Sequence, residues 1–525
     1  MNKNIFKAVL CAALTLPVLS SCELDQEPYS SITYGSSWST YDDACKHYTG
    51  MMTVVRGVVG GSAAYVPEAM ADLFNLRAGA ASLAQEHRWT FTTNQFAGDA
   101  VWANNFSLVM QANDFLANID TFINAEEEGS EKQLRLKHYK GVAYFARAFA
   151  YTNMIVRYCK DYEPETAANE LGLPIVTTVD KEARPSRATL QETVNFILSD
   201  FKNAEDNMQA IRDFDNSSDG LYHPGLDALD ALQMRFALYT HDFDKAIEKA
   251  DIIIDGYSLA SSVAEMQQLW VLDTGSEIIF EPAQTPEERT NGYGTVYISY
   301  DIRQMDGGYD IYGYDPYLVP TQGVVDLYED GDTRKNVYFT NPYMEEAYPK
   351  TKLSNTSTDD PAESAWLLFK FPGNQNLFKN PSDWYSNPYN MSKAFRSAEA
   401  YLTAAEAYLR KATPDEGKAR QYLNDLRSAR NASEIEATVT GQDLVKEMED
   451  EWTREYLGEG KRLDCLKRWH KGFKRMDAQH FNGNLLTSVP NAGYQDLEVS
   501  ASDKRFVWEI PDNDRQANPN LQPNW

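Results

Sequence analysis

The chain has 525 residues and a formal net charge of −28, with 77 acidic against 49 basic side chains. This excess of negative charge repels phosphate backbones, so nucleic acid is not an expected partner. Hydrophobic residues make up 43% of the chain, as in a soluble globular protein, and no segment after residue 21 approaches the roughly 18 consecutive apolar residues of a membrane span. The length predicts one large composite body or two fused layers.

The first 21 residues have the pattern of a cleavable secretory signal. Lys3 and Lys7 precede an apolar run over 8–19 that is too short for a permanent membrane span. The sequence LSSC follows at 19–22 and resembles a bacterial lipobox, in which a small residue precedes a cysteine. We therefore expect Cys22 to become the acylated N-terminus and to anchor the mature protein by lipid. The alternative is an ordinary secretory signal with an incidental cysteine.

An acidic, turn-rich stretch at 22–40 lacks apolar periodicity, which predicts a flexible tether. An N-terminal helical region is expected after it, over 41–256. Thr189 stands three residues before Glu192, the pattern of a capping box at the start of a helix. Apolar residues recur at helical spacing at 41–59, 99–124, 131–158, 186–206, 225–239 and 242–255.

Residues 257–392 differ in composition from the regions on either side. Glycine, asparagine, aspartate, proline and aromatic residues dominate, and the short runs at 277–280 and 367–370 are the strand-like segments. This composition predicts a loop-rich, mostly irregular subdomain laid over a helical scaffold. Long loops on a rigid support commonly carry binding groups.

Two further helical segments are expected in the C-terminal region, 393–525, at 394–410 and 416–429. They share a pattern with the pair at 225–239 and 242–255: small residues inside the first helix, an aromatic residue near its end, and alanines in the second. This pattern resembles tetratricopeptide units of about 34 residues, which stack because none can bury its own face. We therefore predict an all-α fold with tetratricopeptide-like helical pairs as its scaffold.

The sequence lacks the motifs of several standard enzyme classes, since it contains no HExxH, GxSxG, GxxxxGK[ST] or GxGxxG. Its seven histidines do not cluster with carboxylates or cysteines at metal-ligand spacing, so we predict no metal and no cofactor. Carboxylate pairs suited to glycoside hydrolysis occur by chance among 77 acidic side chains, and none can be singled out. Beyond the signal and Cys22, the widely spaced Cys45, Cys159 and Cys465 predict buried, unpaired thiols.

Seven tyrosines fall within 25 residues of the loop-rich region, interleaved with glycines. Glycine between aromatic residues does not build a core, whereas a flat ring can stack on the C–H face of a sugar. The alternative is that these rings cover the scaffold or an interface. The tyrosines are Tyr293, Tyr297, Tyr300, Tyr309, Tyr312, Tyr314 and Tyr317.

Motifs in the C-terminal third carry a resemblance to a known family. Four of them stand in order, at 396–407, 423–427, 451–469 and 510–521, and further matches lie at 147–149, 172–174 and 321–334. Together they resemble the SusD/RagB family of outer-membrane lipoproteins. The resemblance implies a tetratricopeptide-like scaffold and a binding protein without enzymatic activity.

It also implies a location and a role. Such a protein is lipid-anchored at the outer membrane, faces the cell exterior, and captures oligo- or polysaccharide for delivery to a SusC-like TonB-dependent transporter. The acidic tether after Cys22 is similar to the signal that sends such lipoproteins to the outer face. Two alternatives stay open: peptide capture, as in RagB-like members, and a surface glycoside hydrolase.

The resemblance places a sugar site as well. Family members have a tryptophan on an early helix before the first repeat, and Trp102 with Asn105 three residues later fits this pattern. Two polar residues nearby match in the same way, and the tyrosine-rich loops would supply the opposing wall. The candidate glycan-binding residues are therefore Asp72, Arg77, Trp102, Asn105, Tyr293, Tyr309 and Tyr312.

We expect the residues of the family motifs to stabilise the fold and not to contact a ligand. Glu459 and Arg462 are spaced to pair across one helical turn. Asn518 precedes a proline and should set a terminal bend against the body of the protein.

Overall fold

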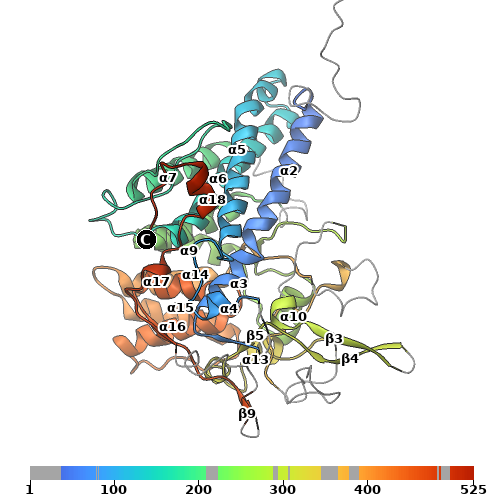
Figure 1. Ribbon diagram of the computed structural model, residues 1–525, viewed down its shortest axis with the longest axis vertical. Helices are drawn as coiled ribbons and strands as arrows, with labels where there is room; N and C mark the ends of the chain where they lie inside the picture. The colour runs from blue at the N-terminus through green and yellow to red at the C-terminus, as the bar shows by residue number, and fades with distance from the viewer. Residues whose placement is uncertain are drawn as a thin grey trace, which may run out of the picture.

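Two long helices form a helical hairpin in the computed structural model of the chain (Figure 1). They are α5 (Asp99–Ala125) and α6 (Glu131–Tyr158). In the short loop between them, the Ser130 hydroxyl accepts a hydrogen bond from the Gln133 backbone N–H and caps α6. Fully buried alanines such as Ala143 let α6 approach its neighbours closely.

The structure describes residues 37–77, 80, 82–208, 223–287, 294–305, 308–343, 365–377, 389–481, 484–485 and 497–525. The backbone alone is described at 294–295, 301–305, 308–313, 480–481 and 484–485. The expected signal, Cys22 and most of the expected tether lie outside the described residues. Among the described helices, none is long and apolar enough to cross a membrane.

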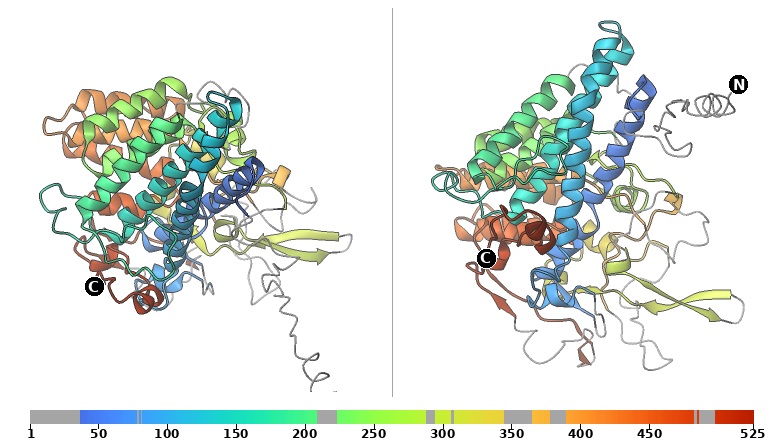
Figure 2. Two further views of the ribbon diagram at one scale, coloured as in Figure 1. Left: turned by 90° about the horizontal axis from the view of Figure 1, so that it is seen from above. Right: turned by 45° about the horizontal axis from the view of Figure 1, so that its top comes forward.

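The other long helices of the N-terminal half stack on this hairpin (Figure 2). Helix α2 (Tyr41–Val59) packs against α5, and α7 (Leu190–Met208) packs against α6. Helices α8 (Leu226–Tyr239) and α9 (Phe243–Gly256) form the next pair. The helices predicted within 41–256 are thus confirmed.

The start of α7 shows why its predicted boundary was early. The Glu192 backbone N–H donates to the Thr189 hydroxyl at 3.1 Å, and the Thr189 backbone N–H donates to the Glu192 carboxylate at 2.8 Å. This confirms the capping box. Because Thr189 is the cap, the helix begins at Leu190 and not at 186.

Two helical pairs that are distant in sequence lie side by side. Helix α14 (Ala398–Arg410) forms a pair with α15 (Glu416–Ala429) and also packs against α8 and α9. Arg235 of α8 donates two hydrogen bonds of 2.6 Å to the carboxylate of Glu399 on α14. The loop-rich region therefore leaves the helical stack after α9 and returns to it at α14. The predicted all-α scaffold is confirmed.

The segment before α14 is a strand instead of the predicted first turn of a helix. Strand β6 (Phe395–Arg396) pairs with β2 (Ile278–Phe280), which confirms the strand predicted at 277–280. The helix predicted from 394 begins only at Ala398 because the preceding backbone is used for this pairing. The run at 367–370 forms no ladder with the described strands.

The other described elements are short. The helices are α3 (Ser62–Met70), α4 (Ala84–His87), α10 (Val263–Val271), α11 (Gly294–Tyr297), α12 (Gln322–Val325), α13 (Thr333–Tyr338), α16 (Gln442–Tyr456), α17 (Arg462–Arg468) and α18 (Asp512–Ala517), with 3-10 turns η3 (Gln375–Leu377) and η5 (Lys504–Phe506). The strands form antiparallel pairs: β1 (Phe74–Leu76) with β5 (Leu318–Pro320), β3 (Tyr300–Met305) with β4 (Gly308–Tyr314), β7 (Phe473–Lys474) with β10 (Glu498–Val499), and β8 (His480–Phe481) with β9 (Asn484–Leu485). The β3–β4 hairpin projects from the body (Figures 1 and 2).

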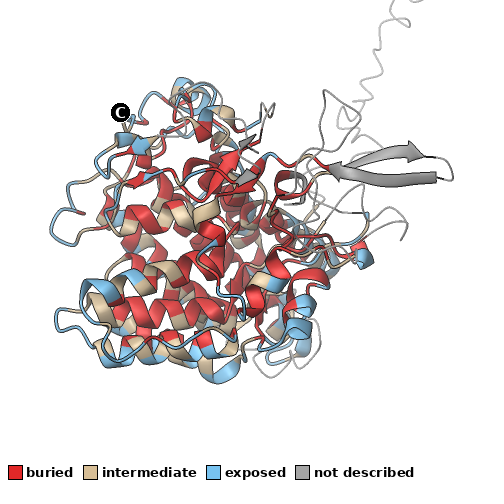
Figure 3. Ribbon diagram, turned by 90° about the horizontal axis from the view of Figure 1, so that it is seen from below, coloured by how far each residue is buried: buried red, intermediate tan, exposed pale blue. Residues whose placement is uncertain are grey.

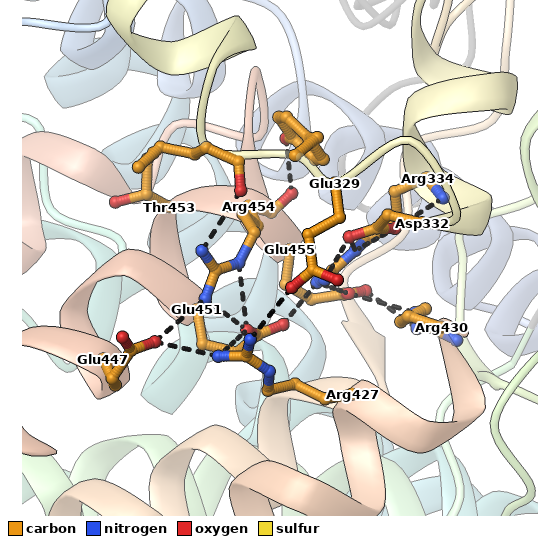
Figure 4. Close-up of polar contacts among 12 residues, drawn as sticks. Glu329, Asp332, Arg334, Arg427, Arg430, Glu447, Glu451, Thr453, Arg454 and Glu455 are labelled. Atoms are coloured by element: carbon orange, nitrogen blue, oxygen red, sulfur yellow. Dashed lines mark hydrogen bonds and ion pairs between the residues drawn. The ribbon is translucent and has the colours of Figure 1, made fainter. Parts of the chain in front are cut away.

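A buried network of ion pairs joins the loop-rich region to the C-terminal helices (Figure 4). Glu455 of α16 is fully buried, and its Oε2 accepts hydrogen bonds of 3.0 Å from Arg334 of α13 and from Arg430. Glu451, one turn earlier, accepts from Arg334 at 2.6 Å and from Arg454 at 2.7 Å. The network thus holds α13 against α16 and the end of α15.

The same network continues beyond α16. Arg396 and Lys370 each donate a hydrogen bond of 2.6 Å to the Glu459 carboxylate. The predicted pair between Glu459 and Arg462 is wrong, because the chain between α16 and α17 is not helical and points the two side chains to different partners. Arg462 instead donates to both carboxylate oxygens of Asp72, at 2.8 Å each.

The arginines shift the pKa values of the buried carboxyl groups. Burial alone would raise the pKa of Glu451, but the guanidinium groups of Arg334 and Arg454 outweigh it and lower this pKa to about 2. Arg430 and the neighbouring arginines hold the pKa of Glu455 well below its usual range against the same effect of burial. Both carboxylates stay ionised at neutral pH and are fully hydrogen-bonded. The network therefore supports the fold and offers no group to a ligand.

Buried residues line the faces that the helices turn toward one another (Figure 3). Cys159 and Cys465 are buried and unpaired, as predicted, and burial raises the pKa of each thiol to about 11. Cys45 is also unpaired but only partly buried. At the C-terminal end, the Asn518 side chain donates to the Pro185 carbonyl at 2.8 Å, which ties the predicted terminal bend to the body.

Candidate functional site

A polar cluster lies where the base of the β3–β4 hairpin meets β1. The β1–β5 ladder continues beyond the strands, because the Arg77 backbone N–H donates to the Tyr317 carbonyl at 2.9 Å. The Asp315 backbone N–H donates to the carbonyl of Ser299, just before β3, at 2.6 Å. These bonds bring Arg77, Asp315 and Tyr317 together, and we call these three residues the hairpin-base cluster.

The side chains of the hairpin-base cluster differ in exposure. The Arg77 guanidinium donates to the Asp315 carboxylate; the Arg77 side chain is 9% exposed and that of Asp315 is 48% exposed. Tyr317, two residues further on, is 36% exposed. A buried guanidinium therefore orients a carboxylate that still faces solvent. Such a carboxylate can accept hydrogen bonds from hydroxyl groups, and an exposed ring can stack on apolar surface.

The described residues contain no group of three or more histidine, cysteine, aspartate or glutamate side chains placed to hold a metal ion. The polar groups that the hairpin-base cluster presents to solvent are the carboxylate of Asp315 and the side chain of Tyr317. These groups can accept a hydrogen bond and make a ring contact.

Trp102 and Asn105 are core residues in this structure. The Trp102 ring is 2% exposed and packs between Phe106 and Tyr158, with ring centroids 4.6 and 5.0 Å away. Asn105 is fully buried and donates to the Val101 carbonyl at 2.7 Å. A ring whose faces are covered cannot stack on a sugar, so the geometry does not support the predicted ligand contacts of these two residues.

Asp72 is likewise used inside the protein. It is 4% exposed, and both of its carboxylate oxygens accept from Arg462, which ties the end of α3 to α17. Of the polar pair predicted near the site, Arg77 alone therefore lies in the hairpin-base cluster. The structure does not bring Asp72 or Trp102 to it.

The predicted tyrosines divide between core and hairpin. Tyr297 and Tyr314 are 0% and 6% exposed and pack on phenylalanine rings, which is the covering role considered as the alternative. Tyr309 and Tyr312 lie in β4, and their side chains are outside the described part of the structure. Tyr293 lies outside the described residues.

Asp315 is the cluster residue that the sequence did not single out, and Tyr317 was named only as one of the seven loop tyrosines. Tyr317 belongs to the tyrosine-rich run, but its exposure depends on the turn between β4 and β5. Asp315 is one of 77 acidic residues, and its pairing with Arg77, 238 positions away, distinguishes it. The local signal was an acidic residue between two tyrosines at 314–317, within a glycine-rich stretch.

Family models match both halves of the chain. A model described as "SusD family" matches residues 277–525, and one described as "Starch-binding associating with outer membrane" matches residues 24–238. The chain belongs to the SusD family. The first match covers the buried network and most of the hairpin-base cluster, and the second covers Arg77.

A curated relative of this SusD-family chain is the starch-binding protein SusD of Bacteroides thetaiotaomicron. The two are 32% identical over 130 residues, and the match covers 25% of the chain and 20% of that protein. The matched stretch thus spans only about one fifth of the relative's length.

Solved structures share the fold over nearly the whole chain. A SusD superfamily protein from Bacteroides thetaiotaomicron has a TM-score of 0.72 at 24% identity, with 93% of this chain and 100% of that one covered. A SusD-like carbohydrate-binding protein from Bacteroides vulgatus has a TM-score of 0.67 at 18% identity, covering 92% and 97%. The surface glycan-binding protein A from Bacteroides uniformis has a TM-score of 0.66 at 17% identity, covering 92% and 99%. At these identities the likeness establishes the fold alone.

Proposed function

We propose that the protein is a cell-surface lipoprotein that binds oligo- or polysaccharide and delivers it to a SusC-like TonB-dependent transporter of the outer membrane. The observation that carries the proposal is the SusD-family match in both halves of the chain, one of whose models describes starch binding in association with the outer membrane. The curated relative is named for starch binding, and two structural neighbours for carbohydrate or glycan binding. The protein would act by binding, without catalysis.

The hairpin-base cluster is our candidate for the sugar contact. Asp315, oriented by Arg77, would accept hydrogen bonds from sugar hydroxyl groups, and Tyr317 would stack on a ring face. The exposure of both side chains supports this assignment. The side chains of Tyr293, Tyr309 and Tyr312 remain candidates for the opposing wall, on the ground of their place in the same loops.

A lipid on Cys22 would hold the molecule at the end where α2 begins. Trp38, just before α2, stacks on His47 with ring centroids 3.9 Å apart and donates from its indole N–H to Asp114 at 3.3 Å. From there back to Cys22, roughly 15 residues could reach about 50 Å when extended. The start of α2 and the neighbourhood of β5 lie toward opposite ends of the molecule, which would turn the hairpin-base cluster away from the anchor (Figure 1).

Isothermal titration of the lipid-free chain against a panel of soluble polysaccharides and a peptide mixture tests the proposed ligand class. We expect binding to at least one glycan and none to the peptides. Binding of peptides alone would replace the glycan proposal with peptide uptake. Release of reducing ends from a bound glycan would contradict a role without catalysis.

The sugar contact is tested by Asp315→Asn and Tyr317→Ala, measured against the glycan that binds best. Loss of a hydrogen bond to a charged acceptor predicts that Asp315→Asn weakens affinity by about tenfold or more. Loss of the ring should weaken affinity by about fivefold. Asp206→Asn on α7, whose carboxylate is 55% exposed and paired with Lys202, is the matched control and should leave affinity unchanged. Unchanged affinity in both cluster variants would remove the hairpin-base cluster from the site without removing the glycan proposal.

A further inference from the structure

A cavity of about 110 Å³ lies inside the helical body, apart from the hairpin-base cluster. Its walls include residues of α2, α3, α6, α8, α10, α14, α16 and α17 and of the chain before β6. A space of this size holds several waters or a small ion.

Several hydrogen-bond donors line the cavity without a partner among the described residues. Arg157 is 8% exposed, and its Nη2 donates to the Ala63 carbonyl at 2.8 Å, but its Nε and Nη1 are unpartnered. The indole N–H of Trp452 and the hydroxyls of Tyr456 and Thr152 are unpartnered in the same wall, and these three residues are 2–4% exposed. Each of these groups can donate a hydrogen bond. Buried donors without partners cost free energy, which points to a guest that accepts hydrogen bonds.

Lys461 adds a positive charge to the same wall. Its Nζ lies 3.7 Å from Glu399 Oε1, beyond hydrogen-bond distance, and both Glu399 oxygens already accept from Arg235 at 2.6 Å. No other ion pair of Lys461 occurs among the described residues. The Lys461 side chain is 23% exposed, and its partial burial lowers its pKa to about 8, so most of the ammonium is still charged at neutral pH.

The charges at the cavity wall do not balance. Three lining cations, Lys393, Arg396 and Arg468, are paired with carboxylates behind the wall. Glu459 and Asp161 have their own basic partners outside the wall, Lys370 and Lys467. The remaining charged groups of the wall have only one another as ion-pair partners among the described residues. They are three cations, Arg157, Arg235 and Lys461, and two carboxylates, Glu399 and Asp464. One positive charge is in excess.

We propose that this cavity binds one small monovalent inorganic anion of the size of chloride, held by Lys461 and by the neighbouring donors of Trp452 and Tyr456. The Trp452 and Tyr456 rings lie 5.4 Å apart, and Lys461 Nζ lies 5.9 Å from the Tyr456 ring, so the three groups share one corner of the wall. The anion supplies both the missing charge and the missing acceptor. It ties α16 to the neighbouring helices and stabilises the folded state by mass action.

Crystals of the full mature chain grown in sodium bromide test the site directly, since bromide is identified by its anomalous scattering. We expect an anomalous peak inside the cavity, within hydrogen-bond distance of Lys461 Nζ. A cavity that holds only water, with no anomalous peak, overturns the proposal. The proposed function plays no part in this test, so the two can fail separately.

Thermal unfolding at constant ionic strength gives the solution test, with fluoride replaced stepwise by bromide. We expect the unfolding midpoint of the wild type to rise with bromide and that of Lys461→Gln to lose this dependence. Tyr456→Phe keeps the packed ring and removes only the hydroxyl, so it should weaken the bromide dependence about tenfold in concentration. Lys446→Gln, on the exposed face of α16 with its side chain 68% exposed, is the matched control and should respond as the wild type does. Wild-type dependence in both cavity variants overturns the assignment.

Discussion

The α5–α6 hairpin and the junction of α13 with α16 both contain fully buried side chains, yet different interactions hold them. In the hairpin, α6 turns apolar side chains such as Val142 and Phe145 into the core. In the junction, the equally buried side chains of Arg334, Glu451 and Glu455 are charged. Burial and hydrophobicity are therefore separate properties here. Side chains that are equally excluded from water are stabilised by apolar packing in the hairpin and by ion pairs in the junction.

The difference affects how each region tolerates change. An apolar interface is the sum of many small contacts, and the loss of one side chain leaves a cavity but no charge. In the ion-pair junction, removal of one partner leaves another buried charge without compensation. A single substitution should therefore cost more in the junction than in the hairpin. The junction also helps to fix the loop-rich region to the helical stack.

Glu455→Gln should break the junction with the largest effect. The substitution keeps the shape but removes the charge that Arg334, Arg396 and Arg430 share, so we expect the free energy of unfolding to fall by about 3–5 kcal/mol in urea. Glu447→Gln on the same helix is the control, since its side chain is 35% exposed and should contribute below about 1 kcal/mol. Equal effects of the two variants would contradict the junction's role.

Trp102→Ala tests the apolar side of the comparison. Because the ring is 2% exposed between two other rings, we expect a loss of about 3 kcal/mol or more that does not depend on salt. Glycan affinity per folded molecule should be unchanged, as measured by titration at a temperature well below unfolding. Abolished binding by a stably folded variant would return Trp102 to the sugar site.

Glu68→Gln sharpens the comparison, because Glu68 is a buried carboxyl group without an arginine partner. Burial raises its pKa from the ordinary value of 4.5 to about 8, so the folded state binds a proton more tightly than the unfolded state does. Wild-type stability therefore falls as pH rises from about 4.5 to 8. Glu451 has the opposite shift, to about 2, and loses its contribution as pH falls from 4.5 toward 2. Relative to wild type, Glu68→Gln should gain up to about 1.4 kcal/mol for each pH unit between pH 4.5 and pH 8 in urea titrations. A pH-independent difference would contradict the shift.

Ser130→Ala should have the smallest effect of the four. It removes the hydroxyl that caps α6, for an expected loss of about 1 kcal/mol in the free energy of unfolding. Ser130→Asp, which keeps a capping oxygen, should restore most of that loss. A loss in Ser130→Asp equal to that in Ser130→Ala would show that the capping oxygen is not the cause.

The helices were predictable because their signals are local. Apolar spacing over 131–158 and the capping residues at 189–192 depend only on neighbours a few positions away. The predictions failed where contacts with residues far away in the sequence determine the local structure. Residues 395–396 pair with β2, and Glu459 and Arg462 turn to separate partners, because their contacts come from segments 60 to 390 positions away.

In the candidate site, too, some residues were predictable from the sequence and others were not. Arg77 and the tyrosine-rich loops were identified from the sequence, since residue type and family pattern mark them. Asp315 was not, because a single acidic residue among 77 has no local signal until Arg77 is placed beside it. Trp102 shows the converse case, in which a residue type suited to stacking is instead packed into the core.

The sequence by itself determined the helical scaffold, the family and the absence of standard enzyme motifs, because periodicity, composition and ordered motifs are properties of neighbouring residues. Only the tertiary structure decided which charges are buried together, which tyrosines face solvent and where an internal cavity collects unpartnered donors. Those properties depend on pairs of residues far apart in the chain, and burial makes their energies large.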